Sequence, residues 1–135
     1  MGRSAVIILK SEDGNRSIAV DKENADELWD FFERDDRHKK KFDHICQLIL
    51  GGHKNTDLYD REEIDEKSHG VTAMKFFKGQ ENARVYCKEI TSEFGVLVVV
   101  CAELHIRKKS QKLTHKERNL IHKVAEYEYT KIEEQ

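Results

Sequence analysis

The 135-residue sequence contains no proline and no apolar run that approaches the roughly 20 residues of a membrane-spanning helix. Its start also lacks a signal-peptide cleavage pattern, so we expect a cytoplasmic protein that does not enter a membrane. The absence of proline leaves every predicted helix and strand uninterrupted. A chain of this length suits one core, and we predict a single domain over residues 1–135.

Cysteine is scarce, and neither cysteine nor histidine has the spacing of a metal site. Cys46, Cys87 and Cys101 form no CxxC pair and lie in apolar patterns, which favours buried reduced thiols. No HxxxH or HExxH pair occurs among the seven histidines, and His115 and His122 would need further ligands from elsewhere. We therefore predict no metal ion and no cofactor.

The formal net charge of -2 hides an uneven distribution of charge. The first 70 residues carry 12 basic and 17 acidic side chains, whereas residues 71–131 carry 12 basic and 7 acidic ones. Four of these cations fall within six positions, directly after the most hydrophobic run. The second half can therefore present a basic surface to an anionic partner.

Apolar periodicity predicts helices and strands together in the first half of the chain. The stretches 4–10 and 17–20 form a predicted hairpin around an Asp-Gly-Asn turn. Apolar residues at helical spacing predict helices over 25–32 and around 42–49, the second ended by a glycine pair. The polar stretch 53–70 is expected to be a surface loop.

Three strands and a helix are predicted to follow. The strands cover 71–77, 83–90 and 96–104, and the last is apolar enough to be central in the sheet. Thr114 and Glu117 match the S/T-x-x-E capping box and predict a helix to about residue 132. The predicted fold is α+β in the order β(β)ααβββα, an antiparallel sheet with two N-terminal helices and a C-terminal helix packed on it.

The strand "ARVYCKEI" carries the first candidate functional residues. Alternation places Arg84, Tyr86 and Lys88 on one face and Val85 and Cys87 on the other. If the second face meets the helices, the first exposes two cations beside an aromatic ring, which suits an RNA backbone and a stacked base. A solvated strand face without function is the alternative.

The motifs "MKFFK", "ARVYCKEI" and "VLVVVCAELHIRKKSQKLTHKE" follow one another in this order before the closing helix. The chain thereby resembles the RelE/ParE superfamily of toxin–antitoxin toxins, in particular its HigB and phage Gp49-like branch, over about residues 71–130. The N-terminal hairpin and the 53–70 loop have no counterpart in the minimal fold. The resemblance implies a ribosome-dependent mRNA endonuclease that uses no metal and is inhibited by a cognate antitoxin.

The resemblance also implies roles for individual residues. Arg84 and Arg107 would stabilise the phosphate while the RNA 2′-hydroxyl attacks it, and His105 would transfer a proton, with Tyr127 or Tyr129 as a supplement. The predicted RNA-binding residues are Lys75, Lys78, Tyr86, Lys88, Lys108, Lys109 and Lys112.

Two other functions stay open at this stage. One is a noncatalytic RelE-like module that binds a partner protein or poisons gyrase in the manner of ParE. The other is a phage or mobile-element protein that kept the fold and lost the activity. Both are favoured by the acidic first half, because toxins of this family tend to be strongly basic. The sequence also leaves the antitoxin, the codon preference and the oligomeric state open.

Overall fold

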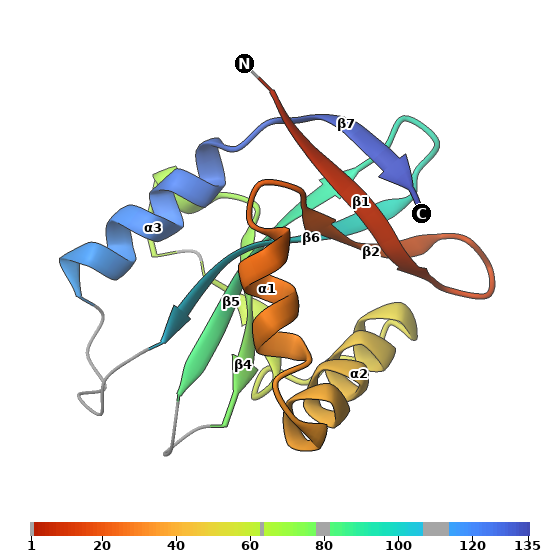
Figure 1. Cartoon of the computed structure of the whole chain (residues 1–135). Helices are drawn as coiled ribbons and strands as arrows, with labels where there is room; N and C mark the ends of the chain where they lie inside the picture. Colours follow the sequence, from red (N-terminus) through yellow and green to blue (C-terminus); the bar gives the residue numbers. More distant parts are fainter. Residues whose placement is uncertain (1, 63, 78–81, 107–113) are drawn as a thin grey trace.

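The computed structural model describes residues 2–62, 64–77, 82–106 and 114–135, which form an α+β fold around one seven-stranded sheet (Figure 1). The elements are β1 (Arg3–Lys10), β2 (Arg16–Asp21), α1 (Ala25–Phe32), α2 (Asp36–Leu50), β3 (Tyr59–Arg61), the 3₁₀ helix η1 (Glu66–Ser68), β4 (Val71–Phe76), β5 (Ala83–Thr91), β6 (Leu97–Ile106), α3 (His115–Glu126) and β7 (Tyr129–Glu134). No helix in the described ranges is both long and apolar enough to cross a membrane.

The sheet has the strand order β3-β4-β5-β6-β2-β1-β7 and is mixed, so the prediction of an antiparallel sheet was wrong in part. The β1–β2 hairpin and the β3-to-β6 meander are antiparallel, whereas β2 is parallel to β6 and β1 is parallel to β7. Parallel pairing needs a long connection between the two strands. In this chain α1, α2 and the strands β3, β4 and β5 lie between β2 and β6. The prediction that β6 is central is confirmed.

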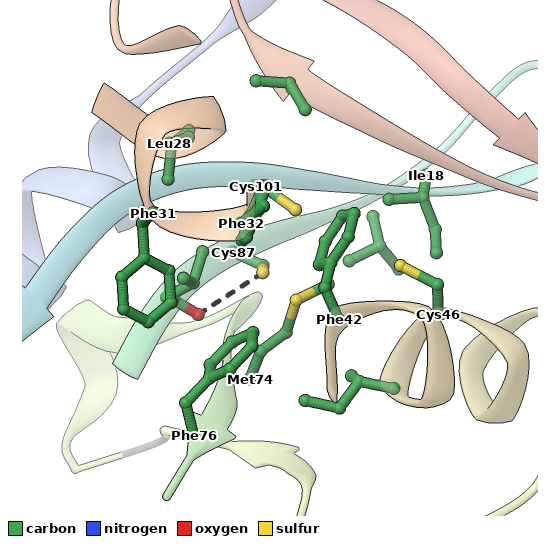
Figure 2. Close-up of a cluster of buried hydrophobic side chains, with 14 of the residues drawn as sticks. Ile18, Leu28, Phe31, Phe32, Phe42, Cys46, Met74, Phe76, Cys87 and Cys101 are labelled. Atoms are coloured by element: carbon green, nitrogen blue, oxygen red, sulfur yellow. Dashed lines mark hydrogen bonds between the residues drawn. The ribbon is translucent and has the colours of Figure 1, made fainter. Parts of the chain in front are cut away.

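Helices cover both faces of the sheet, because neighbouring side chains on a strand point in opposite directions. Val85 and Cys87 of β5 lie in the core under α1 and α2, which Figure 2 shows from close by. Tyr86, between them, lies in a second apolar cluster with Ile121 and Val124 of α3. We call the side of the sheet that Tyr86 occupies the α3 face.

All three cysteines are free and buried, as predicted (Figure 2). Cys87 and Cys101 are cross-strand partners on β5 and β6. Burial raises the pKa of the Cys46 thiol, and a hydrogen bond with Cys87 together with burial raises that of Cys101. Neutral thiols of this kind pack as small apolar groups.

The stretch 53–70 is more ordered than the predicted surface loop. Three of its residues form β3, and the Tyr59 hydroxyl donates a hydrogen bond to Glu89 Oε2 (2.6 Å) and accepts one from Thr72 (2.7 Å). Further along, Asp65 caps η1 and lies 2.8 Å from His122 of α3. A three-residue strand is too short to show an alternating pattern, which is why the sequence does not reveal it.

The closing helix ends at Glu126, so the prediction that it continues to about residue 132 was wrong. Tyr127 has extended dihedrals (φ -62°, ψ 130°), and the chain then forms β7 beside β1. Tyr129 and Ile132 pack against an apolar cluster that contains Ala5 of β1. Burial of these side chains on the sheet outweighs the modest helical preference of the segment.

Candidate functional site

Three of the predicted site residues form one row across the sheet. Arg84 of β5 is the cross-strand partner of Lys75 on β4 and of His105 on β6. Directly paired residues project from the same face, with Cβ atoms about 4.5–5.5 Å apart. This cationic row, Lys75, Arg84 and His105, therefore projects from the α3 face.

The Arg84 guanidinium is held by a carboxylate from the chain that follows β3. Its Nη1 donates a hydrogen bond to Glu62 Oε1, and the two side chains are only 13% and 11% exposed. Arg84 Nε is buried and has no hydrogen-bond partner among the described residues. A buried donor without an acceptor is rare in folded proteins, so this guanidinium is an unusual feature of the site.

A buried carboxylate from α3 reaches the same row. Glu117 is 1% exposed, and its Oε2 accepts a hydrogen bond from the Tyr86 hydroxyl. Its Oε1 lies 3.9 Å from His105 Nε2, so the two groups form an ion pair when the imidazole is protonated. The Thr114 hydroxyl accepts a hydrogen bond from Glu117 N (3.1 Å), which confirms the predicted cap, while the Glu117 side chain is directed at the sheet.

Tyr86 is fully buried, so the prediction that its ring is exposed on the strand was wrong. α3 covers this part of the sheet, and the ring packs against Ile121 and Val124. The described position of Tyr86 therefore provides no platform for a stacked base. Its hydroxyl instead holds the Glu117 carboxylate near His105.

Lys75 is placed at the outer end of the row, next to the chain before β3. Its Nζ donates a hydrogen bond to Thr56 O (3.0 Å) and lies 3.9 Å from Asp60 Oδ2. The remaining predicted cations lie outside the described residues, namely Lys78, Arg107, Lys108, Lys109 and Lys112.

The Lys88 side chain contacts the end of α3 and does not face solvent, which contradicts its predicted exposure on the strand. Its Nζ donates hydrogen bonds to the carbonyl oxygens of Ala125 and Tyr127, the latter at 2.8 Å. Burial lowers the pKa of the ammonium. Carbonyls at the end of a helix lack intrahelical partners, so Lys88 anchors this end of α3 to β5.

We expect Lys88→Met to lower the free energy of unfolding by about 1–3 kcal/mol, because two hydrogen bonds to a charged group are lost. Urea unfolding followed by circular dichroism measures this change. Lys116→Met, at an exposed position of α3, is the matched control and should stay within about 0.5 kcal/mol of the wild type. Equal stability of the two variants would contradict the anchoring role.

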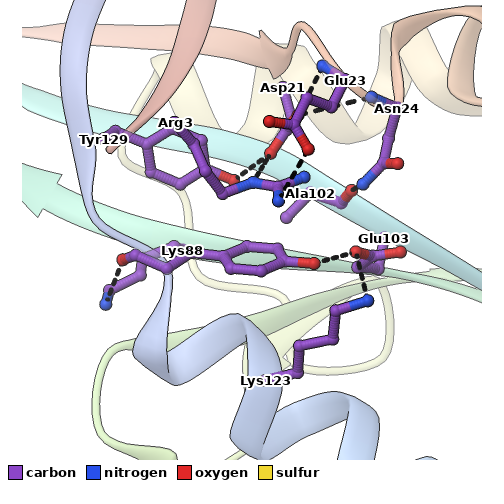
Figure 3. A network of polar contacts seen from close by, with 10 residues as sticks. Arg3, Asp21, Glu23, Asn24, Lys88, Ala102, Glu103, Lys123 and Tyr129 are labelled. Atoms are coloured by element: carbon purple, nitrogen blue, oxygen red, sulfur yellow. Dashed lines mark hydrogen bonds and ion pairs between the residues drawn. The ribbon is translucent and has the colours of Figure 1, made fainter. Parts of the chain in front are cut away.

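The two candidate tyrosines lie in a separate polar network (Figure 3). The Tyr127 hydroxyl donates to Glu103 on β6, and burial together with this carboxylate raises its pKa. The Tyr129 hydroxyl donates to Asp21 (2.7 Å). Neither hydroxyl is bonded to a residue of the cationic row, and both tie the end of the chain to the sheet.

Two carboxylates of the site, Glu62 and Glu117, were not predicted as site residues. Glu62 lies in a polar stretch where no pattern distinguishes it from its neighbours. Glu117 matched a capping motif at the start of the helix. That match gave no indication that its side chain contacts residues of the sheet. A glutamate on the apolar side of α3, in line with Ile121 and Val124, was the one available signal.

The described residues contain no cluster of histidine, cysteine, aspartate and glutamate that could hold a metal ion. Comparisons of the chain with protein-family models, with curated proteins and with solved structures gave no match. The cationic row and the two carboxylates that contact it, Glu62 and Glu117, are the candidate functional site.

Proposed function

We propose that the protein is a toxin of a toxin–antitoxin system, a RelE-type endonuclease that cleaves mRNA on the ribosome without a metal ion. The observation that carries the proposal is the cross-strand pair of Arg84 and His105. It combines, at directly paired positions of β5 and β6, a permanent positive charge with a type of side chain that exchanges protons near neutral pH.

In the proposed reaction the RNA 2′-hydroxyl attacks the adjacent phosphorus, and the bond from phosphorus to the 5′-oxygen breaks. The 2′-hydroxyl proton is removed by a general base, and a proton is delivered to the 5′-oxygen by a general acid. Arg84 stabilises the charge that builds up on the phosphate oxygens.

His105 is the residue that we assign to proton transfer. Its Nε2 lies 3.9 Å from Glu117 Oε1, and we assign it as the general acid that protonates the leaving 5′-oxygen. Glu117 is in turn fixed by the Tyr86 hydroxyl. Neutralisation by a cognate antitoxin would accompany this activity in a cell.

An assay on translating ribosomes tests the proposal. The purified protein should cleave mRNA in the presence of EDTA and leave a 2′,3′-cyclic phosphate or a 3′-phosphate, and its expression alone should arrest bacterial growth. An mRNA with a 2′-deoxynucleotide at the cleavage position should stay intact, because the nucleophile is missing. Cleavage of that deoxy-substituted RNA, or activity that EDTA removes, would contradict the mechanism.

A noncatalytic RelE-like binding module, including a ParE-like gyrase poison, is the second candidate. It is favoured by the internal contacts of three predicted RNA-binding or catalytic cations. Arg84 pairs with Glu62, Lys75 bonds to Thr56 O, and Lys88 bonds to the end of α3. Growth arrest without any RNA cleavage would favour this candidate over the endonuclease.

A further inference from the structure

A second basic region lies where β4 ends against the start of α2, and Phe77 is at its centre. The Arg37 guanidinium lies 3.8 Å above the Phe77 ring, and Lys41 Nζ lies 5.8 Å from the ring centroid. Phe77 has a positive φ of 50°, which is unusual for a bulky residue. We call this region, made of Arg37, Lys41, Lys75 and Phe77, the Phe77 corner.

The charge distribution of α2 is unfavourable for the helix itself. Its first six residues include Arg37, Lys39, Lys40 and Lys41, against a single acidic residue, Asp36. The N-terminal end of a helix carries a partial positive charge, so cations there are repelled by the helix and by one another. Such a concentration of cations is relieved when an anion binds beside them.

The Phe77 corner is hollow enough to hold a phosphate group. A cavity of about 390 Å³ is lined by Lys41, Asp57, Leu58, Lys75 and Phe77. Lys41 forms no hydrogen bond or ion pair with another described residue, and its recorded contact is with the Phe77 ring. The ammonium of Lys41 is therefore available to a ligand in this cavity.

Lys75 connects this cavity to the proposed cleavage site. It lines the cavity together with Lys41, and it is also the cross-strand partner of Arg84. Three cations, Arg84, Lys75 and Lys41, therefore follow one another, with the carboxylates of Glu62, Asp60 and Asp57 beside them. A chain of phosphates, with one negative charge per nucleotide, matches such a line better than a single small anion does.

We propose that the Phe77 corner is a second phosphate-binding subsite, which holds the backbone of single-stranded RNA at least one nucleotide away from the phosphate that is cleaved. The inference depends on the proposed function for the identity of the ligand as RNA. The subsite also defines the direction of the bound RNA. The RNA strand leaves the cationic row past Lys75 and crosses the Phe77 corner toward the first turns of α2.

RNA binding without cleavage tests the subsite separately from the nuclease activity. The His105→Ala variant serves as the background, and its affinity for a fluorescent single-stranded RNA of about 12 nucleotides is measured by anisotropy as a function of salt. Addition of Lys41→Ala should weaken binding about 3- to 10-fold and reduce the slope of log affinity against log salt by about 0.7. Lys41→Arg should retain the affinity.

Lys131→Ala is the matched control, since it removes one cation from β7 at the opposite edge of the sheet. Equal affinities of the Lys41→Ala and Lys131→Ala proteins would overturn the subsite, as expected if the corner binds an acidic protein instead. On this proposal a dinucleotide occupies only the cationic row, so Lys41→Ala should not weaken its binding. An equal loss for the dinucleotide would place Lys41 at the cleavage site and also overturn the inference.

Discussion

Substitution of Arg84 by alanine is expected to lower the rate of RNA cleavage on ribosomes by about 10²- to 10³-fold. Arg84 is the cross-strand partner of His105 and carries a permanent positive charge. Loss of a well-placed charge removes the stabilisation of the developing charge on the phosphate oxygens. Single-turnover cleavage of mRNA on purified ribosomes measures the effect, and Arg84→Lys should fall between alanine and the wild type.

Glu62→Gln is the control for this substitution. It removes the charge that Arg84 faces and keeps an acceptor for its Nη1 hydrogen bond. We expect this variant to keep most of the activity, because the guanidinium remains in place for the phosphate. Thermal unfolding of all three variants checks that the fold survives. Full activity of a folded Arg84→Ala protein would remove Arg84 from the proposed mechanism.

Asp21→Ala is expected to lower the free energy of unfolding by about 3–5 kcal/mol, the typical range for loss of one partner of a buried ion pair. Asp21 is fully buried and accepts hydrogen bonds from Arg3 Nε (2.7 Å), the Tyr129 hydroxyl (2.7 Å) and the backbone nitrogens of Glu23 (2.8 Å) and Asn24 (3.3 Å) (Figure 3). One carboxylate thus joins β1, β2, β7 and the start of α1.

Urea unfolding measures this loss, with two variants for comparison. Tyr129→Phe removes a single hydrogen bond from Asp21 and should cost about 0.5–1.5 kcal/mol. Asp43→Ala, which removes an exposed carboxylate from the middle of α2, should stay within about 0.5 kcal/mol of the wild type. If Asp21→Ala proved no more harmful than Asp43→Ala, the carboxylate would not be the junction described.

Elements with a long, regular apolar pattern were predictable from the sequence. The helix over residues 25–32 has the predicted bounds, and the near-continuous apolar strand is central in the sheet. α2 begins earlier than its apolar pattern, because the Asp35 side chain caps the polar residues that follow (Asp35 Oδ1 to His38 N, 2.8 Å). The sequence predicts helix for the segment of β7, because its strand conformation depends on contacts with β1.

The site was predictable where strand alternation was enough. Alternation correctly separated Arg84 from Val85 and grouped it with the face that also carries His105. It could not reveal that α3 covers Tyr86, because the docking of a helix depends on residues far away in the chain. The positions of Lys88 and Glu62 followed from long-range contacts of the same kind.

The parallel pairing of β7 with β1 has a consequence for the synthesis of the protein. β7 follows every other element in the chain, so β1 emerges from the ribosome long before the strand that covers its outer edge. Until then, the nascent protein exposes a row of unpaired backbone groups, which invites pairing with other chains. Emergence of β7 closes this edge and brings Tyr129 to Asp21, so a chain truncated before β7 should be aggregation-prone.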